Sequence, residues 1–187
     1  MFYLRIMKIG IVSASTRINR ISHRIALSLN KELEQRKQNP QLIDLKEWDL
    51  PVFEERIDRL ENPEKRLLDL KNLLLDCEAF IFLSPEYNGA IASGLKNFMD
   101  LYAKEPFMHK PIGVATGSTG AMGGIRAAYQ LQQNILTIHG LPHPRMLTVG
   151  RMHEVLNEDG EVLEEAFGNT QAKFLDLFLD FAQRFES

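Results

Sequence analysis

The stretch "AFIFLSPEYNGAIASGLKNFMD", residues 79–100, joins three local patterns. An apolar run of strand length, Ala79–Ser84, leads into a polar and aromatic turn, and a pattern of helical period follows from about Ile91 to Tyr102. By periodicity alone the apolar run could also be a buried helix. A strand that leads through a turn into a helix is, however, the repeating unit of a parallel sheet covered by helices. The stretch therefore favours an α/β fold.

The same alternation continues on both sides of this stretch. We expect further strands at Lys8–Ser13, Gln41–Leu45, Pro111–Thr116 and, more weakly, Arg145–Val149. Apolar residues at helical spacing separate them, as in Ile21, Ile25, Leu29 and Leu33. A further helix is expected at about 124–139, and a last one carries Phe174, Phe178, Phe181 and Phe185, which we expect in the core. The pattern predicts five parallel strands with helices on both faces.

Length and composition are those of one soluble domain. The chain has 187 residues, of which 44% are hydrophobic and 25% charged, and its apolar runs are shorter than the roughly 18 residues of a membrane helix. Met7 directly precedes the first expected strand. We interpret residues 1–6 as an N-terminal extension and residues 7–187 as a single domain.

Charge and cysteine content exclude several classes of protein. The net charge is -3 and no block of Lys and Arg is present, which argues against nucleic acid or a membrane surface as a partner. The single cysteine, Cys77, excludes an internal disulfide, fits the cytoplasm, and is more simply a buried structural thiol than a nucleophile. His139 and His143 are separated by Gly140 and Pro142, so no metal site is expected.

Three turns follow the carboxyl ends of the expected strands, where open parallel sheets bind ligands. The first, "SASTRINRIS" (residues 13–22), offers Ser15, Arg17, Asn19 and Ser22, which suit an anion at a helix N-terminus. Alternatively, Ser22 or Asn19 caps the helix and the arginines are solvated. Because both glycine-rich nucleotide fingerprints are missing, hydroxyls and Arg would hold a phosphate here, and Asp44 is expected to cap or face solvent.

The other two turns predict a slot for a flat ring. "SPEYNG" (residues 84–89) supplies a rigid polar edge and an aromatic surface, and its Asn-Gly pair permits positive φ. "TGSTGAMGG" (residues 116–124) contains four glycines, which we expect to let the main chain approach a ligand closely. A phosphate site beside a slot for a planar heteroaromatic describes flavin mononucleotide (FMN) better than a nucleoside triphosphate.

From Met7 onward the chain resembles the NADPH-dependent FMN reductase family of flavodoxin-like proteins, which includes azobenzene, quinone and chromate reductases. The resemblance rests on Ser15, Arg17 and Ser22, on "SPEYNG" followed by "GLKNFMD", and on "TGSTGAMGGIRAAYQL". It implies a three-layer α/β sandwich whose five-stranded parallel sheet has the order 2-1-3-4-5. It also implies a homodimer or homotetramer.

The resemblance further implies how the cofactor is held. The FMN phosphate would contact Ser15, Arg17 and Ser22, with Asn19 and Arg20 as neighbours. The isoalloxazine would lie between two segments that comprise Pro85, Glu86, Tyr87, Asn88, Gly117, Ser118, Thr119 and Gly120. A hydride would pass from NADPH or NADH to the flavin and its electrons to a quinone, azo or similar small acceptor. No protein side chain is expected to be catalytic, because the flavin carries the chemistry.

Two other functions remain open from the sequence. One is a flavodoxin-type electron carrier that binds FMN without reacting with nicotinamide, although such carriers tend to be strongly acidic and this chain is only mildly so. The other is a protein that keeps the fold, binds no flavin and acts through protein contacts.

Overall fold

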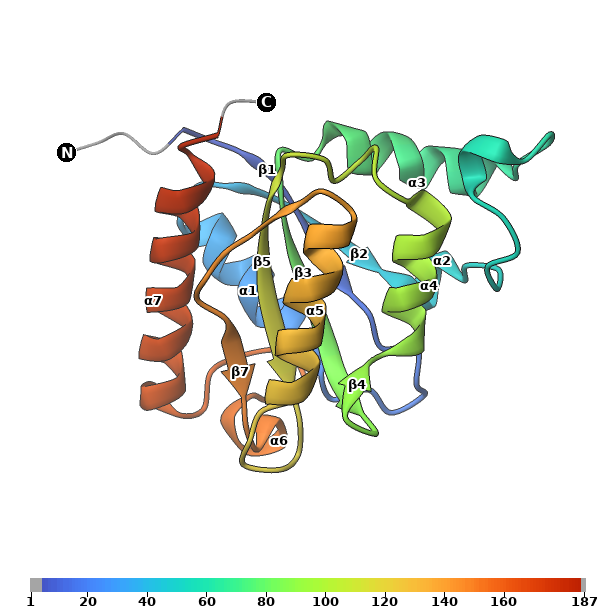
Figure 1. The fold of residues 1–187 in the computed structure, drawn as a ribbon. Coiled ribbons are helices and arrows are strands. Elements are labelled where there is room, and N and C mark those ends of the chain that lie inside the picture. Colours follow the sequence, from blue (N-terminus) through green and yellow to red (C-terminus); the bar gives the residue numbers. More distant parts are fainter. Residues whose placement is uncertain (1–4, 186–187) are drawn as a thin grey trace.

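The computed structural model describes residues 5–185, so most of the proposed extension at residues 1–6 lies outside the described part. A parallel sheet runs through the middle of the molecule (Figure 1). Its strands follow the order β2 (Asn39–Asp44), β1 (Lys8–Ser13), β3 (Ala79–Tyr87), β5 (Pro111–Gly117), with β6 (Leu141–Pro142) and β7 (Leu147–Val149) both paired with β5. The predicted order 2-1-3-4-5 is therefore confirmed, and the short β6 and the antiparallel β4 (Ala90–Ile91) add two strands to the expected five.

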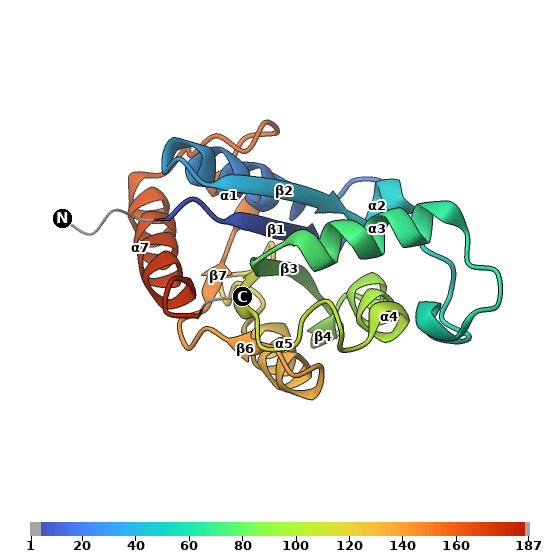
Figure 2. The ribbon, with the colours of Figure 1, turned by 90° about the horizontal axis from the view of Figure 1, so that it is seen from above.

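Helices cover both faces of the sheet (Figure 2). One face carries α1 (His23–Gln35) and α7 (Glu165–Ala182), and the other carries α3 (Lys65–Asp76), α4 (Ser93–Tyr102) and α5 (Ile125–Thr137). Short helical segments occur at α2 (Leu45–Trp48), at α6 (Met152–Val155) and at the 3-10 turn Ile57–Arg59. Along β3, Phe80 and Phe82 enter one apolar cluster while Ile81 and Leu83 enter the other. The strand is hydrophobic throughout because both of its faces are buried.

The phenylalanines predicted to be core differ in burial. Phe174 and Phe178 are fully buried on α7, with ring centroids 6.2 Å apart. Phe181 and Phe185 are only half-buried, and Phe185 follows the end of the helix, so the core prediction is wrong for these two. The buried face of α7 instead continues through Leu179 and Ala182, and Phe181 and Phe185 lie outside it.

Several strand boundaries depart from the prediction by one to three residues, and two of the differences have a clear cause. Strand β2 ends at Asp44 instead of Leu45, because the Asp44 carboxylate accepts the Lys46 N–H at 3.0 Å and starts α2. Strand β3 continues through Pro85, Glu86 and Tyr87, so the predicted turn is reduced to Asn88 and Gly89, with φ of 52° and 79°. The extra residues are strand because Glu86 and Tyr87 pair with β4 in a hairpin.

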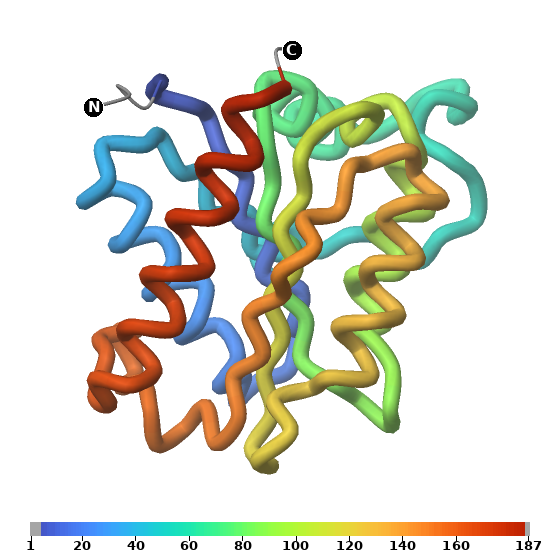
Figure 3. The backbone as a smooth tube through the Cα atoms, turned by 60° about the vertical axis from the view of Figure 1, so that its left-hand side comes forward, coloured from blue at the N-terminus to red at the C-terminus, as the bar shows by residue number. Residues whose placement is uncertain are grey.

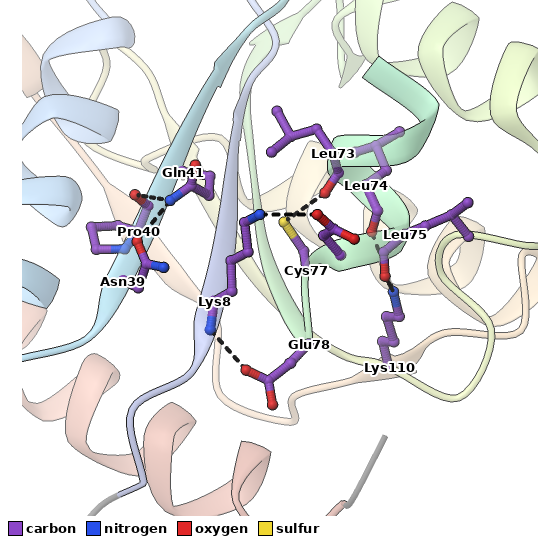
Figure 4. Close-up of polar contacts among 11 residues, drawn as sticks. Lys8, Asn39, Pro40, Gln41, Leu73, Leu74, Leu75, Cys77, Glu78 and Lys110 are labelled. Carbon is purple, nitrogen blue, oxygen red and sulfur yellow. Dashed lines mark hydrogen bonds and ion pairs between the residues drawn. The ribbon is translucent and has the colours of Figure 1, made fainter. Parts of the chain in front are cut away.

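Cys77 lies just before β3 (Figure 4). Its buried thiol donates to the Leu73 carbonyl at 3.2 Å, and burial raises the pKa of Cys77 to about 11. Beside it, the Lys110 ammonium donates to the carbonyls of Leu74 and Leu75 at the C-terminal end of α3, at 3.2 and 2.8 Å. The structure therefore confirms the buried thiol, and a raised pKa opposes a role as a nucleophile.

Two kinds of feature are absent from residues 5–185. No helix in this range is long and apolar enough to cross a membrane. The same residues hold no cluster of three or more His, Cys, Asp or Glu side chains that could bind a metal ion.

Candidate ligand site

A cavity of about 150 Å³ lies where the three predicted loops meet. These loops gather at the carboxyl ends of the strands, away from the start of β1 and the end of α7 (Figure 3). The cavity is lined by Arg17, Asn19, Arg20, Ile21, Ser22, Pro85, Glu86, Tyr87, Gly117, Ser118, Thr119 and Met152. All of the predicted site residues line this cavity except Ser15, Asn88 and Gly120. Met152 belongs to α6, and no sequence signal pointed to it.

Tyr87 joins the first loop to the end of β3. Its hydroxyl lies 2.7 Å from the Oγ of Ser15, which is fully buried. The guanidinium of Arg17 lies over the Tyr87 ring, 5.5 Å from its centroid. Arg17 is exposed and forms no ion pair within residues 5–185, so its charge is available to a ligand. Ser15 is thus a support for Tyr87, although it does not line the cavity.

The backbone of the first loop offers free hydrogen-bond donors. The Ala14 N–H donates to the Leu83 carbonyl at 3.0 Å, but the N–H groups of residues 15–19 have no partner in the described chain. Ser22 occupies the N-cap position of α1, yet its side chain makes no capping bond, so that alternative role is wrong for Ser22. Together with Arg17, these groups form a donor set that suits an anion.

Arg20 has a different environment from Arg17. Both of its terminal nitrogens donate to the two oxygens of Asp44, whose side chain is 4% exposed. One of them also donates to the Ser15 carbonyl at 3.3 Å. The His23 Nδ1 lies 2.9 Å from the Ser13 hydroxyl and 3.8 Å from Asp44. Burial, reinforced by the Arg20 guanidinium, lowers the pKa of His23. The capping role expected of Asp44 is confirmed at α2, whereas its ion pair was not predicted.

Glu86 holds the N-terminus of α5. Its carboxylate accepts the backbone N–H groups of Arg126 and Ala127 at 3.1 and 3.4 Å, and it pairs with the Arg126 side chain at 3.1 Å. The residue at the N-cap of α5 is Gly124, which has no side chain to cap with. That glycine was the available sequence signal that a cap must come from elsewhere in the fold.

The β3–β4 hairpin is tied to α5 at a second point. The Ile91 N–H donates to the Gln130 side chain at 2.8 Å. Asn88 and Gly89 at the tip are exposed, and Asn88 does not line the cavity. The hairpin and α5 therefore form one unit that borders the cavity.

Most glycines of the loop 116–124 serve packing rather than ligand approach. A Cβ at Gly117 would lie 2.6 Å from Ile25 and 2.9 Å from Met152, and one at Gly123 would lie 2.8 Å from the backbone of Thr148. At Gly120 the nearest atom would be 3.9 Å away. Packing thus requires glycine at Gly117 and Gly123, and the approach of this main chain to a ligand stays a prediction.

A larger cavity, of about 590 Å³, lies on the other side of the first loop. It is lined by Thr16, Leu45, Lys46, Asp49, Leu50, Val52, Ser93, Gly94 and Asn97. The Asn97 amide fixes its outer wall by donating to the Pro51 carbonyl at 2.8 Å and accepting the Phe53 N–H at 2.7 Å. The smaller cavity is the better candidate site despite its size, because all three predicted loops border it.

The sequence matches the model of the NADPH-dependent FMN reductase family over residues 7–154. An NADPH azoreductase of Bacillus sp. (strain OY1-2) is 29% identical over 128 residues, which cover 67% of this chain and 68% of the relative. A quinone reductase of Escherichia coli (strain K12) is 25% identical over 141 residues, covering 73% and 75%.

Solved structures support the fold. FerB, a flavoenzyme NAD(P)H:(acceptor) oxidoreductase of Paracoccus denitrificans, aligns with a TM-score of 0.81 and 24% identity, covering 96% of this chain and 98% of FerB. A flavodoxin from the domain Archaea aligns with a TM-score of 0.60 and 14% identity, covering 95% and 98%. The fold is therefore flavodoxin-like.

Proposed function

The chain belongs to the NADPH-dependent FMN reductase family, and from this premise we propose that it is an FMN-dependent oxidoreductase that reduces small acceptors with NAD(P)H. Quinones and azo compounds are the acceptor classes, because the relatives carry these names. The observation that carries the proposal is the free donor set of the first loop, which borders one cavity with the ends of β3 and β5. When bound, FMN would accept a hydride from NAD(P)H and pass the electrons to the acceptor.

The residues present fit FMN. A phosphate in the first loop would receive the free N–H groups of residues 15–19, the unpaired Arg17 guanidinium and the Ser22 hydroxyl. Whole-ligand sites usually measure roughly 300 to 1,000 Å³. The cavity of about 150 Å³ is therefore too small for the whole cofactor, and part of the FMN would lie outside it at the molecular surface. An exposed ring is what exchange with two different small molecules requires.

The side chains around the cavity bind and orient and do not transfer protons. Glu86 is the acid among the lining residues, and its oxygens accept the N–H groups that start α5. The Tyr87 hydroxyl is engaged with Ser15. The role of Glu86 is therefore to hold the hairpin, and with it Pro85 and Tyr87, in place beside the ring.

We also infer a homodimer or homotetramer. The family resemblance implies this assembly, and Ile18, Val52 and Met122, which are 88%, 83% and 72% exposed, are apolar side chains available to such an interface. Sedimentation analysis tests the assembly, and a monomer at all concentrations would contradict it.

We further infer a cytoplasmic protein, because a single unpaired Cys77 suits a reducing compartment. Residues 7–187 are taken as one domain.

Anaerobic flavin reduction tests the function. The purified chain is loaded with FMN, mixed with NADPH or NADH in the absence of oxygen, and the flavin absorbance is followed. We expect bleaching with at least one nicotinamide, and recovery when a quinone or azo dye is added. FMN binding without bleaching would indicate an electron carrier, and failure to bind FMN would reject both flavin functions.

A further inference from the structure

The ion pair between Arg20 and Asp44 lies directly beside the proposed phosphate site. Asp44 ends β2, and its position is fixed because β2 pairs with β1 from Lys8 to Ser13 and its carboxylate starts α2. The Arg20 guanidinium donates hydrogen bonds to both Asp44 carboxylate oxygens and to the Ser15 carbonyl. The guanidinium therefore connects the two ends of the loop segment that carries the free N–H groups of residues 15–19.

We propose that Arg20 and Asp44 are positioning residues that hold the first loop in a phosphate-binding shape. This inference rests on the proposed function, since it assumes that the loop receives the FMN phosphate. Short contacts lead from Asp44 through Arg20 to Ser15, and from the Ser15 hydroxyl to Tyr87. The ends of β2 and β3 are thus joined through the loop that lies between them.

The contacts distinguish this role from direct phosphate binding. Two Arg20 nitrogens are occupied by Asp44, and the Arg20 side chain is 13% exposed, whereas Arg17 is exposed and unpaired in the described chain. The Arg20–Asp44 pair is also neutral as a unit, so it adds little attraction for an anion. Its effect is to fix the loop before the ligand arrives, which lowers the ordering cost of binding.

A planar fork is needed for this geometry. An Arg side chain can contact both carboxylate oxygens and a carbonyl at once, because its donors are held in one plane. A Lys ammonium is a point charge and cannot hold all three acceptors in the same arrangement.

The test compares FMN with riboflavin, which lacks the phosphate. The central variant is the double substitution R20Q/D44N, which removes the Arg20–Asp44 ion pair. It leaves the net charge unchanged and buries no unpaired charge. The matched control is R36Q/E32Q, which removes an Arg–Glu pair at the C-terminal end of α1, away from the first loop. Dissociation constants for both flavins are measured by fluorescence quenching, and thermal unfolding is recorded for each protein.

The expected result is specific to the phosphate. FMN affinity should fall about tenfold in R20Q/D44N, equivalent to about 1.4 kcal/mol, with riboflavin affinity unchanged within about twofold. The control should keep the wild-type ratio. R20K should also bind FMN with less preference over riboflavin than the wild type does. It serves as the test variant if the double variant does not fold.

Other outcomes overturn the inference. An unchanged or increased FMN-to-riboflavin ratio would show that the pair does not position the loop, whatever its effect on thermal stability. An equal loss for both flavins would assign the pair a general structural role. If the wild-type protein binds no FMN, or binds it no better than riboflavin, the proposed phosphate site fails first, and that result is seen without any variant.

Discussion

At the scale of single residues, Arg17 is the one of the two cavity-lining arginines that forms no ion pair in the described chain. It lies over Tyr87 at the mouth of the cavity, beside the free N–H groups of the first loop. Replacing Arg17 by Ala should weaken FMN binding by roughly 1.5 to 3 kcal/mol, the scale of a hydrogen bond to a charged group. Titration of flavin fluorescence measures the loss.

Arg24 provides the control for this prediction. It lies on α1 close to the same loop, but its guanidinium donates to the Leu156 carbonyl at 3.1 Å and pairs with Glu158. The Arg24→Ala protein should bind FMN like the wild type. If both variants bind FMN normally, the phosphate lies outside the first loop.

The sequence predicted the types of residue in the site better than their partners. Ser15, Arg17 and Ser22 stand out because hydroxyls and Arg cluster after a strand. The bonds from Ser15 to Tyr87 and from Arg20 to Asp44 span 72 and 24 residues along the chain. Such partners depend on which strand ends become neighbours, and no local pattern contains that information.

At the scale of elements, Glu86 links a hairpin to a helix. Removing its carboxylate leaves the N–H groups at the start of α5 without a cap, which typically costs about 0.5 to 2 kcal/mol. The Glu86→Ala protein should lose stability in that range in urea unfolding and should bind FMN more weakly. Glu158→Ala is the control, because Glu158 is 91% exposed in its ion pair with Arg24. Equal midpoints for the two variants would rule out the capping role.

His143 couples the edge of the sheet to α7. It is 4% exposed, its ring centroid lies 5.2 to 6.2 Å from those of Phe174, Phe178 and Phe181, and its Nδ1 lies 2.8 Å from the Arg145 carbonyl. Burial lowers the pKa of His143 from its ordinary value of 6.5. The unfolded chain therefore takes up a proton below about pH 6.5 that the folded state resists.

This linkage predicts a pH-dependent difference. His143→Asn removes the titrating group and should cost roughly 0.5 to 3 kcal/mol at pH 8 through lost packing. The deficit should shrink by pH 5.5, because the wild type loses the stabilising contribution of neutral His143 there and the variant does not. Urea unfolding of both proteins at pH 8 and pH 5.5 measures this stability deficit. The same deficit at both pH values would contradict the lowered pKa of His143. Other titrating groups, His23 included, cancel in the comparison.

Element boundaries were predicted less well than element types. The apolar run at 79–84 was correctly favoured as a strand, but β3 extends three residues further because β4 returns to pair with Glu86 and Tyr87. The glycines after β5 were interpreted only as openings for a ligand, and the close packing of Gly117 against Ile25 and Met152 was not predicted. Both differences arise from packing between distant segments.

At the scale of the whole molecule, the alternation of patterns predicted the class of fold, and the resemblance supplied the strand order. Periodicity alone does not say which strands are neighbours, because a parallel pair needs only a crossover of a dozen or more residues, and the pattern does not show where that crossover returns to the sheet. The order β2-β1-β3-β5 places the three predicted loops at one edge. This arrangement is what turns separate loops into one site.

Because the three loops meet there, a ligand bound between them should stabilise the molecule as a whole. FMN at about 100 times its dissociation constant should add about 2.7 kcal/mol to the free energy of unfolding, which for a chain of this length raises the midpoint by roughly 5 to 10 °C. Riboflavin at the same concentration should raise it less, because it cannot use the donors of residues 15–19 or Arg17. Thermal unfolding with each flavin, and with Arg17→Ala at the same FMN concentration, measures the effect. Equal shifts for FMN and riboflavin in the wild type would place the phosphate away from the first loop and leave the ring contacts to explain all of the binding.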